Sequence, residues 1–161
     1  MSGLSFRDTP RPADAELVRK LAQESGGFSS RDIEIAVELV QERLARGLAA
    51  SGYHFLFAEE GSDPRGYACY GPIPLTAASW DLYWIAVPKN VQGNGVGRRL
   101  MAEVERQAKA FGAKHVYIDT SGRADYARSQ AFYKAAGYRL AANLPDFYAP
   151  GDAKLIFAKG L

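Results

Sequence analysis

Hydrophobic residues recur at helical spacing in two early parts of the chain. A stripe of leucine, valine and alanine within residues 17–22 predicts a helix that Asp14 caps and that glycines 26 and 27 end. Apolar positions within residues 33–44, again three and four residues apart, predict a second helix. Ser29 or Ser30 would cap it, and the glycines at 47 and 52 mark its exit.

The pattern then changes to short apolar and aromatic runs, which are typical of strands. Strands are expected over residues 4–8, 54–59, 67–71, 80–87, 115–119 and 155–158. Residues 61–66 have turn composition, and residues 72–79 form a loop with two prolines. Residues 143–152 are expected as a loop before the last strand, in which Phe147 and Tyr148 either pack or form a lid.

Two more helices complete the pattern. Val96, Leu100 and Val104 repeat every four residues in an amphipathic helix that Gly112 ends, and residues 128–136 predict a helix that ends at Gly137. Two early helices, a run of strands and then alternating units indicate a mixed α/β sheet, of the α+β type, with helices on both faces.

Length and composition exclude several classes of protein and of partner. The 161 residues suit a single domain over 1–161, and 47% hydrophobic with 24% charged residues is typical of a folded protein. Twenty Lys and Arg against 18 Asp and Glu give a charge of only +2, so no nucleic-acid partner is expected. No apolar run reaches the roughly 18–20 residues of a membrane helix, and residues 1–8 lack a signal-peptide pattern. We therefore expect a cytoplasmic protein with no membrane partner.

Cysteine and histidine are too rare for several kinds of site. Cys69 is the single cysteine, which excludes an intrachain disulfide and a thiolate cluster, and it is expected as a small core residue. His54 and His115 lie far apart and have no metal-ligand spacing. We therefore expect no metal.

A glycine-rich segment lies between the strongest strand and the amphipathic helix. Gly93, Gly95 and Gly97 carry no side chains, so the amides of residues 93–98 can face one ligand at a helix N-terminus. Arg98 and Arg99 add positive charge, which favours a phosphate group. The segment matches neither the P-loop pattern nor the dinucleotide fingerprint GxGxxG.

The spacing that fits is Gln-x-x-Gly-x-Gly, formed by Gln92, Gly95 and Gly97 after the strand end Ile85-Ala86-Val87. With it, the sequence resembles the GNAT superfamily of N-acetyltransferases. A second block, Ala131-Phe132-Tyr133 followed by Gly137-Tyr138, looks like the family's A-F-Y-x-x-x-G-F/Y signature. The resemblance is clear over roughly residues 80–140.

The resemblance implies a mostly antiparallel central sheet of about six or seven strands, with splayed fourth and fifth strands that admit acetyl-CoA as co-substrate. The main chain of Ile85, Ala86 and Val87 would bind the pantetheine arm. Tyr133 would act as general acid for the departing thiolate. The pyrophosphate would lie on the loop formed by Gln92, Gly93, Asn94, Gly95, Val96, Gly97 and Arg98.

Acetyl transfer to an amine also needs a group that accepts a proton, which is usually a carboxylate. Asp81 shares strand parity with Tyr83, Ile85 and Val87 and is the first candidate. Asp119, at the end of the next strand, is the second, and Glu59 is a distant third.

We therefore expect an N-acetyltransferase that transfers acetyl directly to a primary amine of a small molecule or a protein, without a covalent enzyme intermediate. The family resemblance makes a homodimer reasonable. Two alternatives remain at this point: a non-catalytic acyl-CoA-binding or sensor module on the same fold, and a nucleotide-binding regulator with a glycine-rich turn.

Overall fold

A computed structural model describes residues 3–161. In chain order the elements are β1 (Leu4–Arg7), α1 (Asp14–Ser25), α2 (Ser30–Ser51), β2 (His54–Glu60), β3 (Asp63–Pro72), β4 (Ser79–Ala86), α3 (Val96–Ala110), β5 (His115–Ser121), the 3-10 turn η1 (Ala124–Tyr126), α4 (Ala127–Ala135), β6 (Arg139–Ala149) and β7 (Asp152–Gly160). All the helices predicted from the sequence are present. One strand, β6, was not predicted.

The strands form one mixed sheet of seven strands in the order β1-β2-β3-β4-β5-β7-β6. The β4–β5 pair is parallel, whereas β1–β2, β2–β3, β5–β7 and β6–β7 are antiparallel. The parallel ladder joins Ser79–Asp81 to His115–Tyr117 and stops there, although β5 continues to Ser121. The predicted fold class, a mostly antiparallel mixed sheet whose fourth and fifth strands separate, is confirmed.

The chain packs as two compact units, and each is described by itself. Unit 1 is the chain up to Gly71 together with Trp84–Val104, and unit 2 is Pro72–Tyr83 together with Glu105–Leu161. Strand β4 and helix α3 each begin in one unit and end in the other. The glycine-rich loop lies in unit 1, and the predicted tyrosine and aspartates lie in unit 2.

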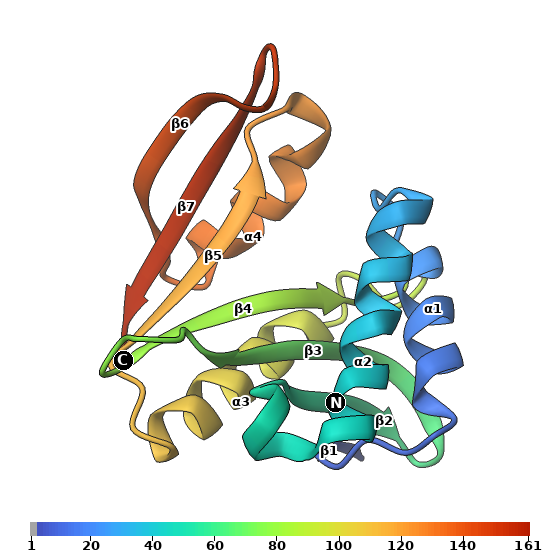
Figure 1. Cartoon of the computed structure of the whole chain (residues 1–161). Coiled ribbons are helices and arrows are strands. Elements are labelled where there is room, and N and C mark those ends of the chain that lie inside the picture. The colour runs from blue at the N-terminus through green and yellow to red at the C-terminus, as the bar shows by residue number, and fades with distance from the viewer. Residues whose placement is uncertain (1–2) are drawn as a thin grey trace. The chain divides into compact units, whose positions relative to one another are not determined.

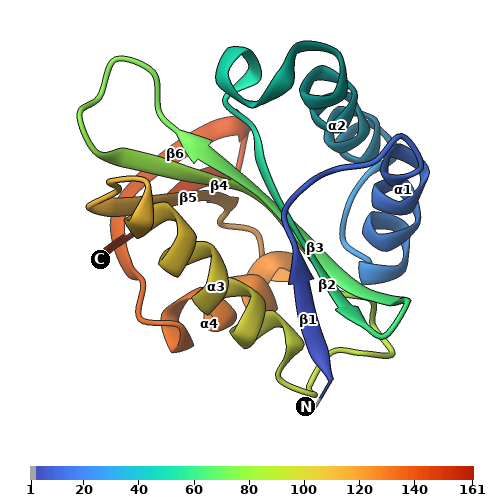
Figure 2. The ribbon, with the colours of Figure 1, turned by 90° about the horizontal axis from the view of Figure 1, so that it is seen from below.

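Unit 1 has a core formed by the central strands and the helices on either side of them. Four consecutive residues of β2, Phe55–Ala58, are buried, and so are Tyr67–Tyr70 of β3. Since neighbouring strand residues point to opposite faces, both faces of these strands are covered. Figure 2 shows α1 and α2 on one face and α3 on the other. Cys69 belongs to this core, as predicted.

The ends of α1 and α2 show how well caps are predicted from sequence. Ser29 caps α2 as expected: its Oγ accepts from the Asp32 amide at 3.1 Å, and its amide donates to the Asp32 carboxylate at 2.9 Å. The expected capping role of Asp14 is wrong. Asp14 is the first residue of α1, and its carboxylate instead forms an ion pair with Arg7 at 2.8 Å.

The boundary between β2 and β3 is also tighter than predicted. β3 already begins at Asp63, so most of the expected turn over residues 61–66 is strand. The reason lies at Gly66, where a Cβ would come within 3.0 Å of the Ala86 carbonyl oxygen. The glycine that resembles a turn residue therefore permits close packing inside a strand.

Unit 2 is built on β5, β7 and β6, which lie side by side in that order (Figure 1). All seven residues of β5 pair with β7, and β6 pairs with the other side of β7. The predicted loop over residues 143–152 is therefore wrong, because it comprises most of β6 and the start of β7. Nearly every residue of β6 is exposed, so this edge strand has no alternating pattern to reveal it.

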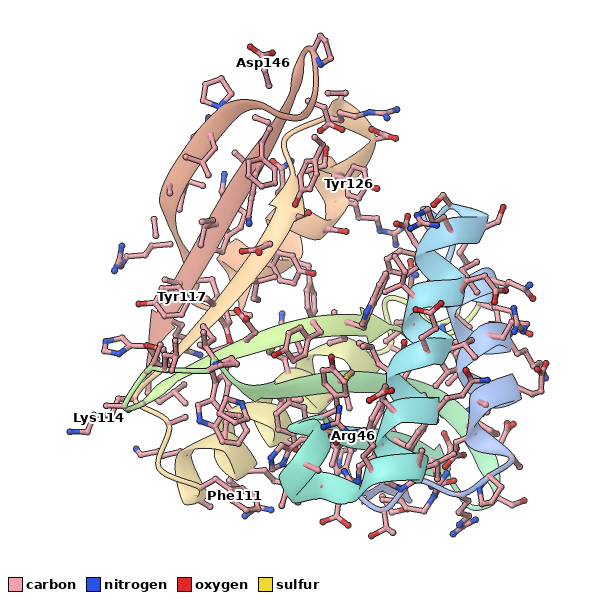
Figure 3. The ribbon with its side chains drawn as sticks, in the orientation of Figure 1. Arg46, Phe111, Lys114, Tyr117, Tyr126 and Asp146 are labelled. Carbon is pink, nitrogen blue, oxygen red and sulfur yellow. The ribbon has the colours of Figure 1, made fainter. Side chains whose placement is uncertain are left out.

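The hairpin between β6 and β7 carries the turn chemistry that suggested a loop. Asp146, labelled at the outer end of the hairpin in Figure 3, has φ 57 and accepts a hydrogen bond from the Gly151 amide at 2.7 Å. Within residues 3–161, no helix is long and apolar enough to cross a membrane. No group of histidine, cysteine or acidic residues in that part of the chain is arranged to hold a metal ion.

Candidate functional site

The loop between β4 and α3 exposes main chain at the start of a helix. Gly93 and Gly95 have φ 89 and 81, and nothing lies within 4 Å of the position of a Cβ on either. These φ values are costly for any residue with a side chain. The amide of Arg99 donates to the Gly95 carbonyl at 3.1 Å, so the amides just before it are those that a helix leaves without an earlier carbonyl. This is the geometry that favours an anion.

Gln92 braces this loop through its side chain. Its Nε2 donates to the Val87 carbonyl at 2.8 Å and to the Ser25 carbonyl at 3.3 Å. Three residues earlier in the same loop, the Lys89 amide donates to the Glu24 carbonyl at 2.9 Å. The loop is thus tied to the C-terminal end of α1, and the predicted motif glutamine holds the backbone of unit 1.

The two predicted aspartates come together on one face of unit 2. The parallel ladder places Asp81 opposite Tyr117, which Figure 3 labels on β5, and Asp119 follows two residues later on the same face. Asp81 is half-buried, and loss of solvent, followed by the charge of Asp119, raises its pKa to about 6. The ammonium of Lys154 opposes this rise.

Two aromatic residues of β6 lie beside Lys154 and Asp119. Lys154 forms an ion pair with Asp119 at 3.1 Å, and its Nζ lies 4.6 Å from the centre of the Phe147 ring. The rings of Phe147 and Tyr148 meet edge to face at 5.1 Å. Burial, and then the charges of Asp119 and Asp152, raise the pKa of the Tyr148 phenol. The face therefore combines carboxylates, one ammonium and aromatic rings.

Tyr133 lies on α4, against the other face of the same strands. Its ring packs on Phe157 at 5.9 Å and on Tyr138 at 6.5 Å between ring centres. Ile156 of β7 pairs with Asp119, and Phe157 is the next residue, so the side chains of Phe157 and Asp119 point to opposite faces of the sheet. Desolvation raises the pKa of Tyr133 to about 12, so the phenol keeps its proton at neutral pH.

Glu59, the third candidate base, lies in unit 1 and is held by another cation. Its carboxylate lies 3.4 Å from Nε of Arg7, whose guanidinium also binds Asp14. Lys154, in contrast, was not found by sequence reasoning. It faces Asp119 only because of the β5–β7 register, in which Ser121 pairs with Lys154. No motif marks it.

Comparison with known proteins decides the family. The model of the acetyltransferase (GNAT) family matches residues 17–138. The chain belongs to the GNAT family. Over 110 residues this GNAT protein is 33% identical to a blasticidin-S acetyltransferase of Streptomyces morookaense, a match that covers 66% of this chain and 76% of that protein.

Solved structures show the same fold. A GNAT-family acetyltransferase of Desulfovibrio desulfuricans is similar to this GNAT protein with a TM-score of 0.94 and 43% identity, over 98% of both chains. A GNAT acetyltransferase of Elizabethkingia anophelis, solved with acetyl-CoA bound, has a TM-score of 0.70 and 18% identity over 100% of both chains. The second likeness is one of fold alone.

Proposed function

We propose that this GNAT protein transfers the acetyl group of acetyl-CoA directly to a primary amine, with residues 1–161 acting as one catalytic domain. One observation carries the proposal: the half-buried carboxylate of Asp81 lies on the same face as a second carboxylate, Asp119, and burial raises its pKa to about 6. At neutral pH such a group is ionised and still basic enough to take a proton. The similar blasticidin-S acetyltransferase and the neighbour with bound acetyl-CoA support it.

Asp81 is the proposed base. An amine at neutral pH is mostly ammonium, so it must lose a proton before its nitrogen can attack the thioester carbonyl. Asp81 takes that proton directly or through one water, and Asp119 is the second candidate for the same step. The C–N bond then forms, and the C–S bond breaks, without an acyl-enzyme.

Tyr133 is the proposed acid. It holds its proton at neutral pH, since its pKa is about 12, and donates toward the sulfur as the C–S bond breaks. A free thiol has a pKa of about 8.5, so complete transfer to a separated thiolate would be uphill by roughly 5 kcal/mol. The donation is therefore most useful while the sulfur is still leaving the tetrahedral carbon.

The β4–α3 segment is the proposed acetyl-CoA site. The main chain of Ile85, Ala86 and Val87 would bind the pantetheine arm as an added strand binds a sheet edge. The pyrophosphate would lie on the amides and positive charge of residues 92–98, namely Gln92, Gly93, Asn94, Gly95, Val96, Gly97 and Arg98. The exposed glycines and the braced loop of unit 1 support this assignment.

The decisive experiment follows thiol release from acetyl-CoA across a panel of primary amines. Turnover should require an amine, and both Asp81→Asn and Tyr133→Phe should lower kcat by on the order of 10²- to 10⁴-fold. Asp119→Asn, tested alongside, decides between the two carboxylates. Tyr53→Phe, a change in unit 1, is the matched control for loss of a phenol hydroxyl.

Acetyl-CoA that stabilises the protein, without turnover on any amine, would contradict the proposal and favour a binding or sensor module. Stabilisation by ATP or NAD but not by CoA would favour a nucleotide-binding regulator.

A further inference from the structure

A partly buried network of hydrogen bonds joins α3 and β7 to the segment between α4 and β6. Glu105 of α3 accepts from the Tyr138 hydroxyl at 2.9 Å through one oxygen and from Lys159 Nζ at 2.8 Å through the other. Lys159 of β7 also donates to the Ala136 carbonyl at 2.8 Å. The network therefore meets at the junction between α4 and β6.

This network is shielded from solvent more than an ordinary surface ion pair. The side chains of Glu105 and Lys159 are 15% and 29% exposed. Burial and the negative charge of Glu105 both raise the pKa of Tyr138, so its hydroxyl remains a donor. Charge-assisted hydrogen bonds of this kind are stronger than neutral ones. Removing one partner leaves the other group without a hydrogen bond in a place with little access to water.

Gly137 lies beside the lysine at the end of α4. Its φ is 95, a conformation that favours glycine, and a Cβ there would lie 3.4 Å from Lys159 Cε, which is an ordinary contact distance. The Ala136 carbonyl is one of those that a helix end leaves without a partner, and a positive charge at this end is favourable. Lys159 supplies both the hydrogen bond and the charge.

The same junction holds Tyr133. The Tyr138 amide donates to the Tyr133 carbonyl at 3.0 Å, and the two rings contact at 6.5 Å. Helix α4 has only nine residues. Isolated helices shorter than about 12 residues are marginal in water, so tertiary anchoring determines where α4 places its side chains. Tyr138 is such an anchor, and Glu105 in turn holds Tyr138.

We propose that Glu105, Tyr138 and Lys159 are positioning residues that fix Tyr133 for proton donation to the leaving sulfur. The inference rests on the proposed function, because it takes Tyr133 to be the acid. As positioning residues, none of the three needs to touch the reacting atoms. They act through the last turn of α4, on the main chain and the ring of Tyr133.

A double-mutant cycle separates positioning from mere stabilisation. Tyr138→Phe removes one hydroxyl, and Glu105→Gln removes the charge that anchors it. In the otherwise unchanged protein, each should lower kcat by roughly 10- to 100-fold, the scale of a misplaced catalytic group, with KM for acetyl-CoA unchanged within about 2-fold. In a Tyr133→Phe background, neither change should lower kcat further.

Two variants of the lysine and one distant control complete the design. Lys159→Met should behave like Glu105→Gln, whereas Lys159→Arg keeps a donor and should recover most of the kcat. Glu42→Gln breaks an exposed pair with Arg46 on α2 and should leave kcat unchanged. All assays are run well below the melting temperature of each variant, so that lost turnover is not lost folding.

The outcomes are distinct. An equal loss of kcat from Tyr138→Phe with and without Tyr133 would overturn the positioning role and leave only a structural one. An unchanged kcat in Tyr138→Phe would also overturn it. If Tyr133→Phe itself keeps full turnover, then the acid assignment fails first, and the positioning inference falls with it while amine-dependent thiol release still stands.

Discussion

Lys154 Nζ lies 3.1 Å from Oδ2 of Asp119, on the same sheet face as Asp81. Two opposite charges, those of Asp119 and Lys154, therefore act on the proposed base Asp81. The carboxylate of Asp119 raises the pKa of Asp81, and the ammonium of Lys154 lowers it. Since burial is the largest cause, the pKa still rises to about 6. Burial sets most of the pH range in which Asp81 can accept a proton, and the charges of Asp119 and Lys154 adjust it.

This balance predicts how the pH profile responds to mutation. The base form of Asp81 is present above its pKa, so kcat/KM should fall as pH drops through about 6. Lys154→Gln removes the opposing positive charge and should move that acidic limb to higher pH. Asp119→Asn should move it to lower pH. The measurement is kcat/KM from pH 4 to 9 with one acceptor, whose own amine titration is then common to all variants.

Lys20→Gln, which removes an exposed lysine on α1, is the matched control and should leave the acidic limb in place. If the Lys154 and Asp119 variants keep the limb of the unchanged protein, Asp81 is not the group that titrates in it.

Asp81→Asn should stabilise the protein above pH 6 while it lowers activity. The folded-state pKa of Asp81 lies above its usual range, so the folded protein binds this proton more tightly than the unfolded chain. The stabilisation is complete below about pH 4 and is lost as pH rises through about 6. A neutral asparagine escapes that loss. Thermal denaturation should therefore show a higher Tm for the variant at pH 8, with little difference at pH 4.

Asp63→Asn, at an exposed carboxylate of β3, is the control for a change of net charge. A lower Tm for Asp81→Asn at both pH values would instead mean that the ionised carboxylate stabilises its surroundings.

The sequence allowed the helices and the glycine loop to be predicted, because both leave local signals. Apolar residues at helical spacing predict α1 to α3, and most of these residues form the buried faces of the helices. Closely spaced glycines predict the loop before α3, and two of them, Gly93 and Gly95, have positive φ. The edge strand β6 leaves no such signal, since residues on both of its faces are exposed and one of its edges is unpaired. Lys154 and Glu105 gain their roles from partners that are distant in sequence. Asp119 lies 35 residues before Lys154, and Lys159 lies 54 residues after Glu105. Register and packing alone bring such pairs together.

Gly95→Ala should weaken the proposed acetyl-CoA site. At φ 81 an alanine costs about 1–2 kcal/mol, so the loop should leave this conformation and the main chain should lose its alignment. We expect KM for acetyl-CoA to rise by roughly 10-fold, because a strain of this size corresponds to about a tenfold change in affinity. Steady-state kinetics at saturating acceptor measures it.

Gly47→Ala is a closely matched control within unit 1. Gly47 has φ 83 and also has nothing within 4 Å of a Cβ position, so an alanine is strained there too without meeting a neighbour. Gly47→Ala should lower Tm and leave KM unchanged. If the two variants raise KM equally, strain in unit 1, and not the loop itself, is responsible.

Gln92→Glu tests whether the motif glutamine braces the loop or binds the cofactor directly. Its Nε2 donates to the carbonyls of Val87 and Ser25, and a glutamate would place an ionised acceptor against both. Loss of the hydrogen bonds costs about 1–3 kcal/mol, so the variant should have a lower Tm even without ligand, and a raised KM for acetyl-CoA. Gln41→Glu, on the exposed side of α2, should change neither. A raised KM with an unchanged Tm would show that Gln92 acts on the cofactor rather than on the loop.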